Sequence, residues 1–150
     1  MAIEISIERV KLVRESSHIY SFSSREVSSP DVVADVINEV LDLNHEPQEI
    51  VCEIMLNTKN HIVGVMEVTR GTLDSSLVHP REVFRGAILH NAASIILCHN
   101  HPSGDSAPSR EDMKVTERIK QAGKVLGIDL LDHVIIGNGE YTSIREEGLL

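Results

Sequence analysis

The sequence predicts an α/β domain in which helices pack against a mixed, partly antiparallel sheet. Two observations support this fold class. Three segments carry apolar residues at helical spacing, and short runs rich in β-forming residues separate them. Aromatic residues are scarce, with two Tyr, two Phe and no Trp among 150 residues. Val, Ile, Leu and Ala must therefore build the core, which suits a sheet flanked by helices, and the length favours one core over two.

Residues 1–28 are predicted to form an N-terminal extension, and residues 29–150 a single domain. Scattered apolar residues give the extension only weak strand signals, and its serines favour turns. The domain begins at Ser29–Asp31, whose residues suit the cap, the first position and the positive end of a helix. Apolar residues recur at helical spacing over 32–41, so we expect an amphipathic helix that is closed by Pro47.

A β-hairpin and a second helix are expected next. Residues 49–56 are rich in β-formers, residues 57–60 favour a turn, and residues 61–68 return the chain. Residues 69–74 are then expected to form a loop. Pro80 suits the start of a helix, behind which apolar residues again share one face.

A short strand leads into a third helix. Residues 94–98 (SIILC) are almost wholly apolar, which is typical of a central strand covered on both faces. A loop over 99–109 connects this strand to a helix from Arg110 to about Lys124. Its predicted buried stripe includes Met113, Thr116, Ile119 and Ala122.

The C-terminal segment predicts further strands. Residues 128–131 and 134–136 form either two strands or one bent strand, and the Asn138–Gly139 turn lets residues 141–144 pair back. The order of elements is therefore helix, hairpin, helix, strand, helix and strands. This order gives a mixed sheet with helices packed on it.

Composition narrows the classes of function. The formal net charge of −9 does not support nucleic acid as a main partner, because proteins that bind the phosphate backbone usually carry a basic patch. No apolar run is long enough for a membrane span and the first residues are charged, so we expect no membrane segment and a cytoplasmic location. Cys52 and Cys98 lie in apolar runs and are expected to be reduced, buried residues.

Chemistry is concentrated in the segment that follows the apolar strand. His99 and His101 are two residues apart, so an extended backbone would point both imidazoles the same way. Ser109 is a natural N-cap for the third helix, and Asp112 then lies in its first turn, where the helix dipole favours a carboxylate. Two imidazoles and one carboxylate are ligand types that zinc prefers.

Three protein ligands would leave a fourth zinc position for water, which separates a catalytic site from a structural one. Zinc lowers the pKa of bound water from about 16 to about 7, and a general base is needed to take its proton. Paired histidines and a capping Ser–Asp pair also occur without metal. What favours a site is their combination at the end of an apolar strand beside a helix N-terminus. The H-E-x-x-H pattern of zincins and the H-x-E and P-C-x-x-C patterns of nucleobase deaminases are absent from the sequence.

The spacing H-x-H, seven residues, S, two residues, D matches the JAMM motif of the JAB1/MPN/Mov34 metalloprotease fold. Over roughly residues 30–150 the sequence resembles the RadC-like bacterial branch of that fold. The segments that carry this resemblance are LNTKN, GTL, VHPREVF, NAASIIL, HNHPSG, LLDHVIIG and EEGLL.

The resemblance implies a three-layer α/β/α domain of the cytidine-deaminase-like, JAB1/MPN architecture. It also implies one Zn²⁺ held by His99, His101 and Asp112, with Ser109 polarising the scissile carbonyl or the oxyanion. The acid/base glutamate of the family lies on the strand after the first helix. Glu49 best fits that place, while Glu53 and Glu67 stay open as alternatives.

The function expected from this resemblance is a zinc-dependent hydrolase, a metallopeptidase or isopeptidase acting on a peptide or protein through a metal-activated water. A non-catalytic interaction module that keeps the fold is an alternative, as is an accessory role in DNA repair or recombination. RadC-like proteins often carry an N-terminal helix-hairpin-helix region. The fewer than thirty residues before the first helix are too few for it, which weakens the DNA-repair alternative.

Overall fold

The computed structural model describes residues 1–13, 17–22, 24, 26–71 and 78–150. Within these ranges the chain forms α-helices, one short 3-10 helix (η1) and β-strands. Their bounds are α1 (Pro30–Leu41), η1 (Leu43–His45), β1 (Ile50–Leu56), β2 (Ile62–Arg70), α2 (Pro80–Leu89), β3 (Ser94–Asn100), α3 (Arg110–Leu126), β4 (Asp129–Ile136) and β5 (Tyr141–Ser143).

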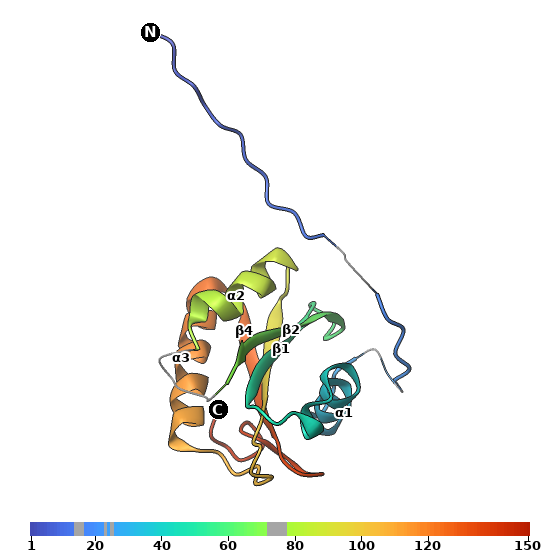
Figure 1. The fold of residues 1–150 in the computed structure, drawn as a ribbon. Coiled ribbons are helices and arrows are strands. Elements are labelled where there is room, and N and C mark those ends of the chain that lie inside the picture. Colours follow the sequence, from blue (N-terminus) through green and yellow to red (C-terminus); the bar gives the residue numbers. More distant parts are fainter. Residues whose placement is uncertain (14–16, 23, 25, 72–77) are drawn as a thin grey trace.

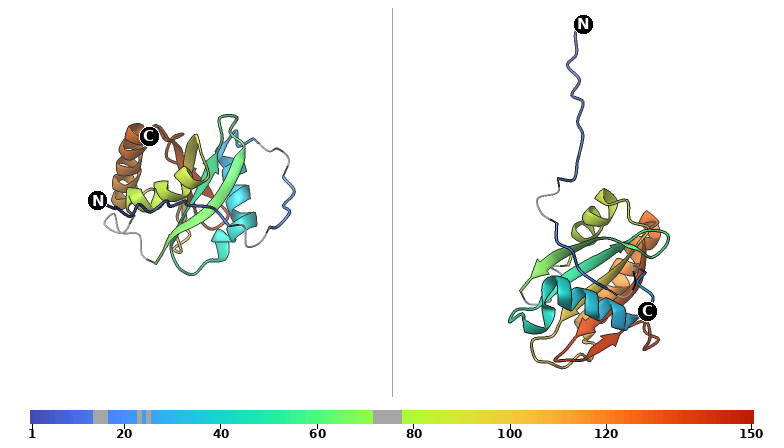
Figure 2. Two further views of the ribbon diagram at one scale, coloured as in Figure 1. Left: turned by 90° about the horizontal axis from the view of Figure 1, so that it is seen from above. Right: turned by 90° about the vertical axis from the view of Figure 1, so that its right-hand side faces the viewer.

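The strands form one mixed sheet in the order β2-β1-β3-β4-β5. β3 and β4 are parallel, and the other neighbouring pairs are antiparallel. Helix α1 covers one face of the sheet, and α2 and α3 cover the other (Figures 1 and 2). The predicted α/β class with a mixed, partly antiparallel sheet in a three-layer arrangement is therefore confirmed.

The core lies on both faces of the sheet, because β1 and β3 are buried along their whole length. Such strands need apolar residues on both faces, which explains the nearly continuous apolar runs in the sequence. The cluster on the α1 face includes Val33, Ile37, Cys52, Ile54, Ile96 and Cys98. The cluster under α2 and α3 includes Val51, Met55, Phe84, Leu97, Val115 and Ile119.

Strand ends differ from the sequence prediction where a neighbouring strand supplies backbone partners. β3 continues through His99 and Asn100, because both residues stay in register with β4. The predicted loop over 99–109 therefore begins only at His101. β2 continues to Arg70, so the predicted loop over 69–74 starts later, and residues 72–74 lie outside the described part. The C-terminal segment over 129–136 is one strand.

The buried face of α3 is also shifted from its prediction. Thr116 and Ile119 are buried as expected, but Met113 and Ala122 are only half-buried, and Val115 and Gly123 take their places. The physical reason is Asp112, whose buried side chain sets which face of the first turn points inward. Positions three, four, seven and eleven residues after Asp112 then share that face.

The N-terminal extension has no strand in its described residues, so its weak strand signals were wrong there. Ile3 and Ile5 are exposed, and the segment runs away from the domain (Figure 1). The chain joins the core at Val27, whose amide donates to Asn60 O. No helix in the described ranges is long and apolar enough to span a bilayer.

Candidate metal centre

The two histidines of the motif lie at the end of β3. His99 is fully buried, and its backbone pairs with Val51 of β1 and Ile135 of β4. His101 follows the strand, and its amide donates to Ile136 O at 2.8 Å, which keeps the chain extended. Both imidazoles therefore point the same way, and their Nε2 atoms are 2.9 Å apart.

Asp112 reaches the same point from the first turn of α3. The Asp112 amide donates to Ser109 Oγ at 3.1 Å, and the Ser109 amide donates to Asp112 Oδ2 at 2.6 Å, so the two residues form a capping box. This reciprocal pair fixes the carboxylate. Asp112 Oδ1 lies 3.1 Å from His99 Nε2, and Oδ2 lies 3.2 Å from His101 Nε2.

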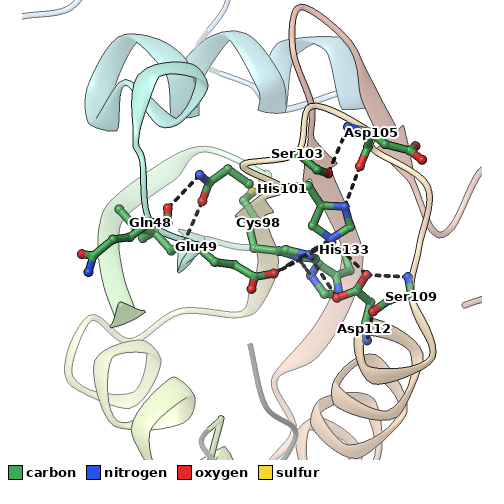
Figure 3. Close-up of polar contacts among 12 residues, drawn as sticks. Gln48, Glu49, Cys98, His101, Ser103, Asp105, Ser109, Asp112 and His133 are labelled. Atoms are coloured by element: carbon green, nitrogen blue, oxygen red, sulfur yellow. Dashed lines mark hydrogen bonds and ion pairs between the residues drawn. The ribbon is translucent and has the colours of Figure 1, made fainter. Parts of the chain in front are cut away.

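Glu49 approaches from the opposite side, directly before β1. Its Oε1 is 3.9 Å from His99 Nε2 and 4.0 Å from His101 Nε2. Figure 3 shows its side chain extending toward His101 and Asp112. One ligand atom from each of the four residues lies within 4.8 Å of the others. β1 is antiparallel to β3, so the start of one strand lies beside the end of the other.

The remaining ring nitrogens of the two histidines have partners away from the centre. His101 Nδ1 lies 2.7 Å from Asp105 O, and because a carbonyl oxygen can only accept, Nδ1 must carry the proton. Its Nε2 then offers a lone pair to the centre. The side chain of Asp105 stabilises the turn, since its Oδ1 accepts a hydrogen bond from the Ala107 amide. His99 Nδ1 lies 2.7 Å from Nε2 of a third histidine, His133.

The electrostatics of the centre favour a cation. Burial opposes ionisation of Asp112, but His101 and His99 beside it hold the pKa of this carboxyl well below its usual range. The same contact with Asp112 raises the pKa of His101. Asp112 Oδ1 is buried and makes no hydrogen bond within the described residues. A buried acceptor without a donor is costly, and a metal ion would satisfy it.

The donor set fits zinc in its chemistry. Two imidazole nitrogens and a carboxylate oxygen are ligand types of three-ligand zinc sites. Ser109 is exposed, and its hydroxyl faces the Asp112 amide; it is not one of the four clustered residues. The structure thus brings Glu49, His99, His101 and Asp112 together.

The two alternative glutamates lie elsewhere. Glu53 is fully buried, and neither of its carboxylate oxygens makes a hydrogen bond within the described residues. A side chain at Gly86 of α2 would come within 2.7 Å of Glu53 Oε1, so this carboxyl lies under that helix. Glu67 is bound at the surface by Arg70. Of the three glutamates considered, Glu49 is the one within reach of both histidines.

Asn100 is a residue whose role sequence reasoning did not assign. It lies between the two histidines and points to the other face of the strand. Its Oδ1 accepts from the Ile50 amide at 2.7 Å, and its Nδ2 donates to Gln48 O at 2.9 Å. These bonds clamp the backbone on both sides of Glu49. A buried Asn at a strand end is the one signal that could have indicated this role.

Asp132 and His133 are adjacent on β4, and the His133 amide donates to Asp132 Oδ1 at 2.7 Å, but their side chains have different further partners. Asp132 accepts from the Ser143 hydroxyl at 2.6 Å and from the Arg145 amide at 3.1 Å, so it holds the strand β5 and the segment after it. His133 instead turns toward His99. Of the two side chains, His133 is the one that contacts a proposed ligand.

Two hollows lie next to residues of the centre, one beside His101 and one beside Glu49. One of about 360 Å³ is lined by His101 together with η1 and residues 137–138, and one of about 310 Å³ is lined by Glu49, Gln48 and Gly71. Both include Pro47 and Pro102 in their walls. His101 is 15% and Glu49 18% exposed at the side chain, so solvent reaches these two residues of the centre.

Comparisons with known proteins agree with the motif. The model of the family described as "RadC-like JAB domain" matches residues 27–149. The chain is 50% identical over 125 residues to a UPF0758 protein of Clostridium beijerinckii, covering 83% of the chain and 53% of the relative. A UPF0758 protein of Clostridium acetobutylicum is 52% identical over 130 residues (87% and 56%), and one of Clostridium tetani is 47% identical over 142 residues (93% and 61%). The chain thus spans little more than half the length of these relatives.

Proposed function

Since this chain belongs to the family of RadC-like JAB domains, we propose that it is a zinc-dependent hydrolase of the JAMM type, a metallopeptidase or isopeptidase. The observation that carries the proposal is the convergence of Glu49, His99, His101 and Asp112 within 4.8 Å. The proposed substrate is a peptide or protein, as the match to the JAMM motif implies, and the partly exposed side chains of His101 and Glu49 leave the centre open to it.

His99, His101 and Asp112 are the residues that would hold the metal. All three are fixed by the fold before a metal binds: His99 by two neighbouring strands, His101 by its bond to Asp105 O, and Asp112 by the capping box. A bound zinc ion supplies Lewis acidity and makes hydroxide available near neutral pH.

Glu49 is proposed as the general base and acid. Its carboxylate is too far from the two Nε2 atoms for a hydrogen bond, at 3.9 and 4.0 Å. It is close enough to take a proton from a water molecule held between them and to pass that proton to the leaving amine. Asn100 keeps Glu49 in this place by clamping the backbone of Ile50 and Gln48.

Ser109 is proposed to stabilise the oxyanion. Its Oγ accepts from the Asp112 amide, which leaves the hydroxyl proton available to donate to a substrate carbonyl oxygen. The residue also lies at the N-terminus of α3, where the helix dipole favours negative charge.

The test compares wild type with Glu49→Gln, both loaded with zinc, on a library of internally quenched peptides and lysine-linked isopeptides. We expect wild type to cleave a subset of the library. Glu49→Gln should retain its zinc and lose on the order of 10²-fold or more in turnover, as loss of a general base does.

Glu67→Gln is the matched control, because Glu67 lies at the surface and binds Arg70. It should cleave at the rate of wild type. Full turnover in Glu49→Gln would remove the residue from its proposed role, and failure of the zinc-loaded wild type on every member of the library would contradict the hydrolase proposal.

A further inference from the structure

A third histidine contacts a proposed metal ligand at the ring nitrogen that points away from the centre. His133 is fully buried on β4, the parallel neighbour of β3. Its Nε2 lies 2.7 Å from His99 Nδ1, and its Nδ1 lies 2.7 Å from Thr116 Oγ1 on α3. Thr116 in turn donates its hydroxyl to Asp112 O at 2.7 Å. Two side chains outside the proposed ligand set therefore connect two proposed ligands.

The positions of the protons in this chain follow from what each atom can do. A carbonyl oxygen only accepts, so the single hydroxyl proton of Thr116 must point at Asp112 O. Thr116 Oγ1 can then only accept from His133, which places a proton on His133 Nδ1. In a neutral imidazole one nitrogen donates and the other accepts, so His133 Nε2 has the lone pair. That lone pair accepts from His99 Nδ1, and His99 Nε2 is left to face Asp112.

We propose that His133 and Thr116 are positioning residues that fix the tautomer and the ring orientation of His99 for metal binding. An imidazole without such a partner can place its proton on either nitrogen and can rotate about its side-chain bonds, and both changes remove the lone pair from the centre. The hydrogen-bond chain removes this freedom. Because it ends on the backbone of Asp112, it also ties the ligand on β3 to the ligand on α3.

This inference rests on the proposed metal centre and adds residues that are not ligands. A histidine that merely fills space in the core would give a different result on substitution, since its packing volume would matter and the Thr116 hydroxyl would not. Loss of an outer partner of a metal-ligating histidine typically weakens metal binding by about 10- to 100-fold. Removal of the Thr116 hydroxyl is therefore the most direct test of the chain of hydrogen bonds.

The experiment compares Thr116→Val with Thr116→Ser in the full chain. Val keeps the shape of Thr but removes the hydroxyl, whereas Ser keeps the hydroxyl and loses a methyl group. The Zn²⁺ dissociation constant is measured by competition with a chromophoric chelator, after urea unfolding has shown that each metal-free variant is folded. We expect Thr116→Val to bind Zn²⁺ about 10- to 100-fold more weakly than wild type, and Thr116→Ser to bind within about threefold of it.

A second readout follows the protons directly. In ¹⁵N-labelled, zinc-loaded wild type, His99 Nδ1 should show the NMR shift of a protonated ring nitrogen and His133 Nε2 that of an unprotonated one. His133→Leu should broaden or split the His99 ring signals. A protonated His133 Nε2, or equal Zn²⁺ affinity in Thr116→Val and wild type, would overturn the positioning role.

The outcomes separate this inference from the proposed function. If wild type binds no Zn²⁺, both the metal centre and the positioning role are lost. If Zn²⁺ binds and the Thr116 variants differ as expected but no peptide is cleaved, the positioning role stands and the hydrolase proposal falls. If the variants bind alike, only the positioning role falls.

Discussion

Two buried carboxyl groups lie on the same face of the sheet in opposite surroundings. Asp112 meets two imidazoles and the Ser109 amide, so its charged form is favoured. Glu53 has no hydrogen-bond donor within the described residues, and burial raises the pKa of Glu53 to about 8. At neutral pH Asp112 is therefore ionised and suited to a cation, while Glu53 is protonated and behaves as a neutral core residue.

The raised pKa of Glu53 makes the stability of the fold depend on pH. The folded chain holds a proton between the unfolded pKa of about 4.3 and the folded value of about 8. The free energy of unfolding must therefore fall as pH rises through this window and level off above it. We expect Glu53→Gln to match wild type near pH 5 and to exceed it by about 4 kcal/mol at pH 8.5.

Urea unfolding at the two pH values measures this difference. The stability curve of Glu53→Gln should be the flatter of the two across the window. Parallel curves for wild type and variant would show that Glu53 has an ordinary pKa in the folded chain and has found a partner or solvent.

The candidate site could be predicted only in part from single residues. The convergence of His99, His101 and Asp112 follows from local rules, namely the alternation of an extended chain and the capping of a helix. The contact of His133 with His99 depends on the register of β3 against β4, which shifts between Ile95 and Ile96. No local pattern predicts such a shift, so the sequence alone does not place His133 beside His99.

At the scale of elements, two glycines at the end of α3 are required for different physical reasons. A Cβ on Gly123 would meet Ile128 O at 2.3 Å and Phe84 Cζ at 3.2 Å, so this position lets the chain entering β4 cross the helix closely. Gly127 is the C-cap with φ of 72°, and nothing lies within 4 Å of where its Cβ would be. Gly123 is needed for space, and Gly127 for its backbone conformation.

Alanine substitutions should separate these two requirements. We expect Gly127→Ala to lower the free energy of unfolding by about 1 kcal/mol, the cost of a left-handed residue with a side chain. Gly123→Ala should cost about 3 kcal/mol or more, because a backbone oxygen must move. Thermal or urea unfolding of both variants checks the order. A smaller loss in Gly123→Ala than in Gly127→Ala would contradict the close crossing.

Helix starts were more predictable than strand ends. Pro30, Pro80 and Ser109 mark the starts of α1, α2 and α3 by local chemistry, and the structure begins these helices at or directly after them. The end of β3 depends on backbone partners in β4, which lies about thirty residues further on. A sequence window that covers only one strand does not contain that information.

At the scale of the whole molecule, the centre exists because three elements meet at one edge of the sheet. The start of β1 supplies Glu49, the end of β3 supplies the two histidines, and the first turn of α3 supplies Asp112. Composition and periodicity predicted the α/β class but not the strand order β2-β1-β3-β4-β5. That order places the antiparallel β1 beside β3 and so brings Glu49 to the histidines.

The zinc content of purified protein tests this account most directly. Wild type and the two variants Asp112→Asn and Glu53→Gln are dialysed against metal-free buffer after exposure to Zn²⁺ and analysed by mass spectrometry of the metal. Asp112→Asn keeps the shape of the capping residue, and Glu53→Gln removes a buried carboxyl outside the cluster. We predict about one zinc per chain in wild type and Glu53→Gln and less than about a tenth of that in Asp112→Asn. Equal zinc in all three proteins, or none in wild type, would contradict the metal centre.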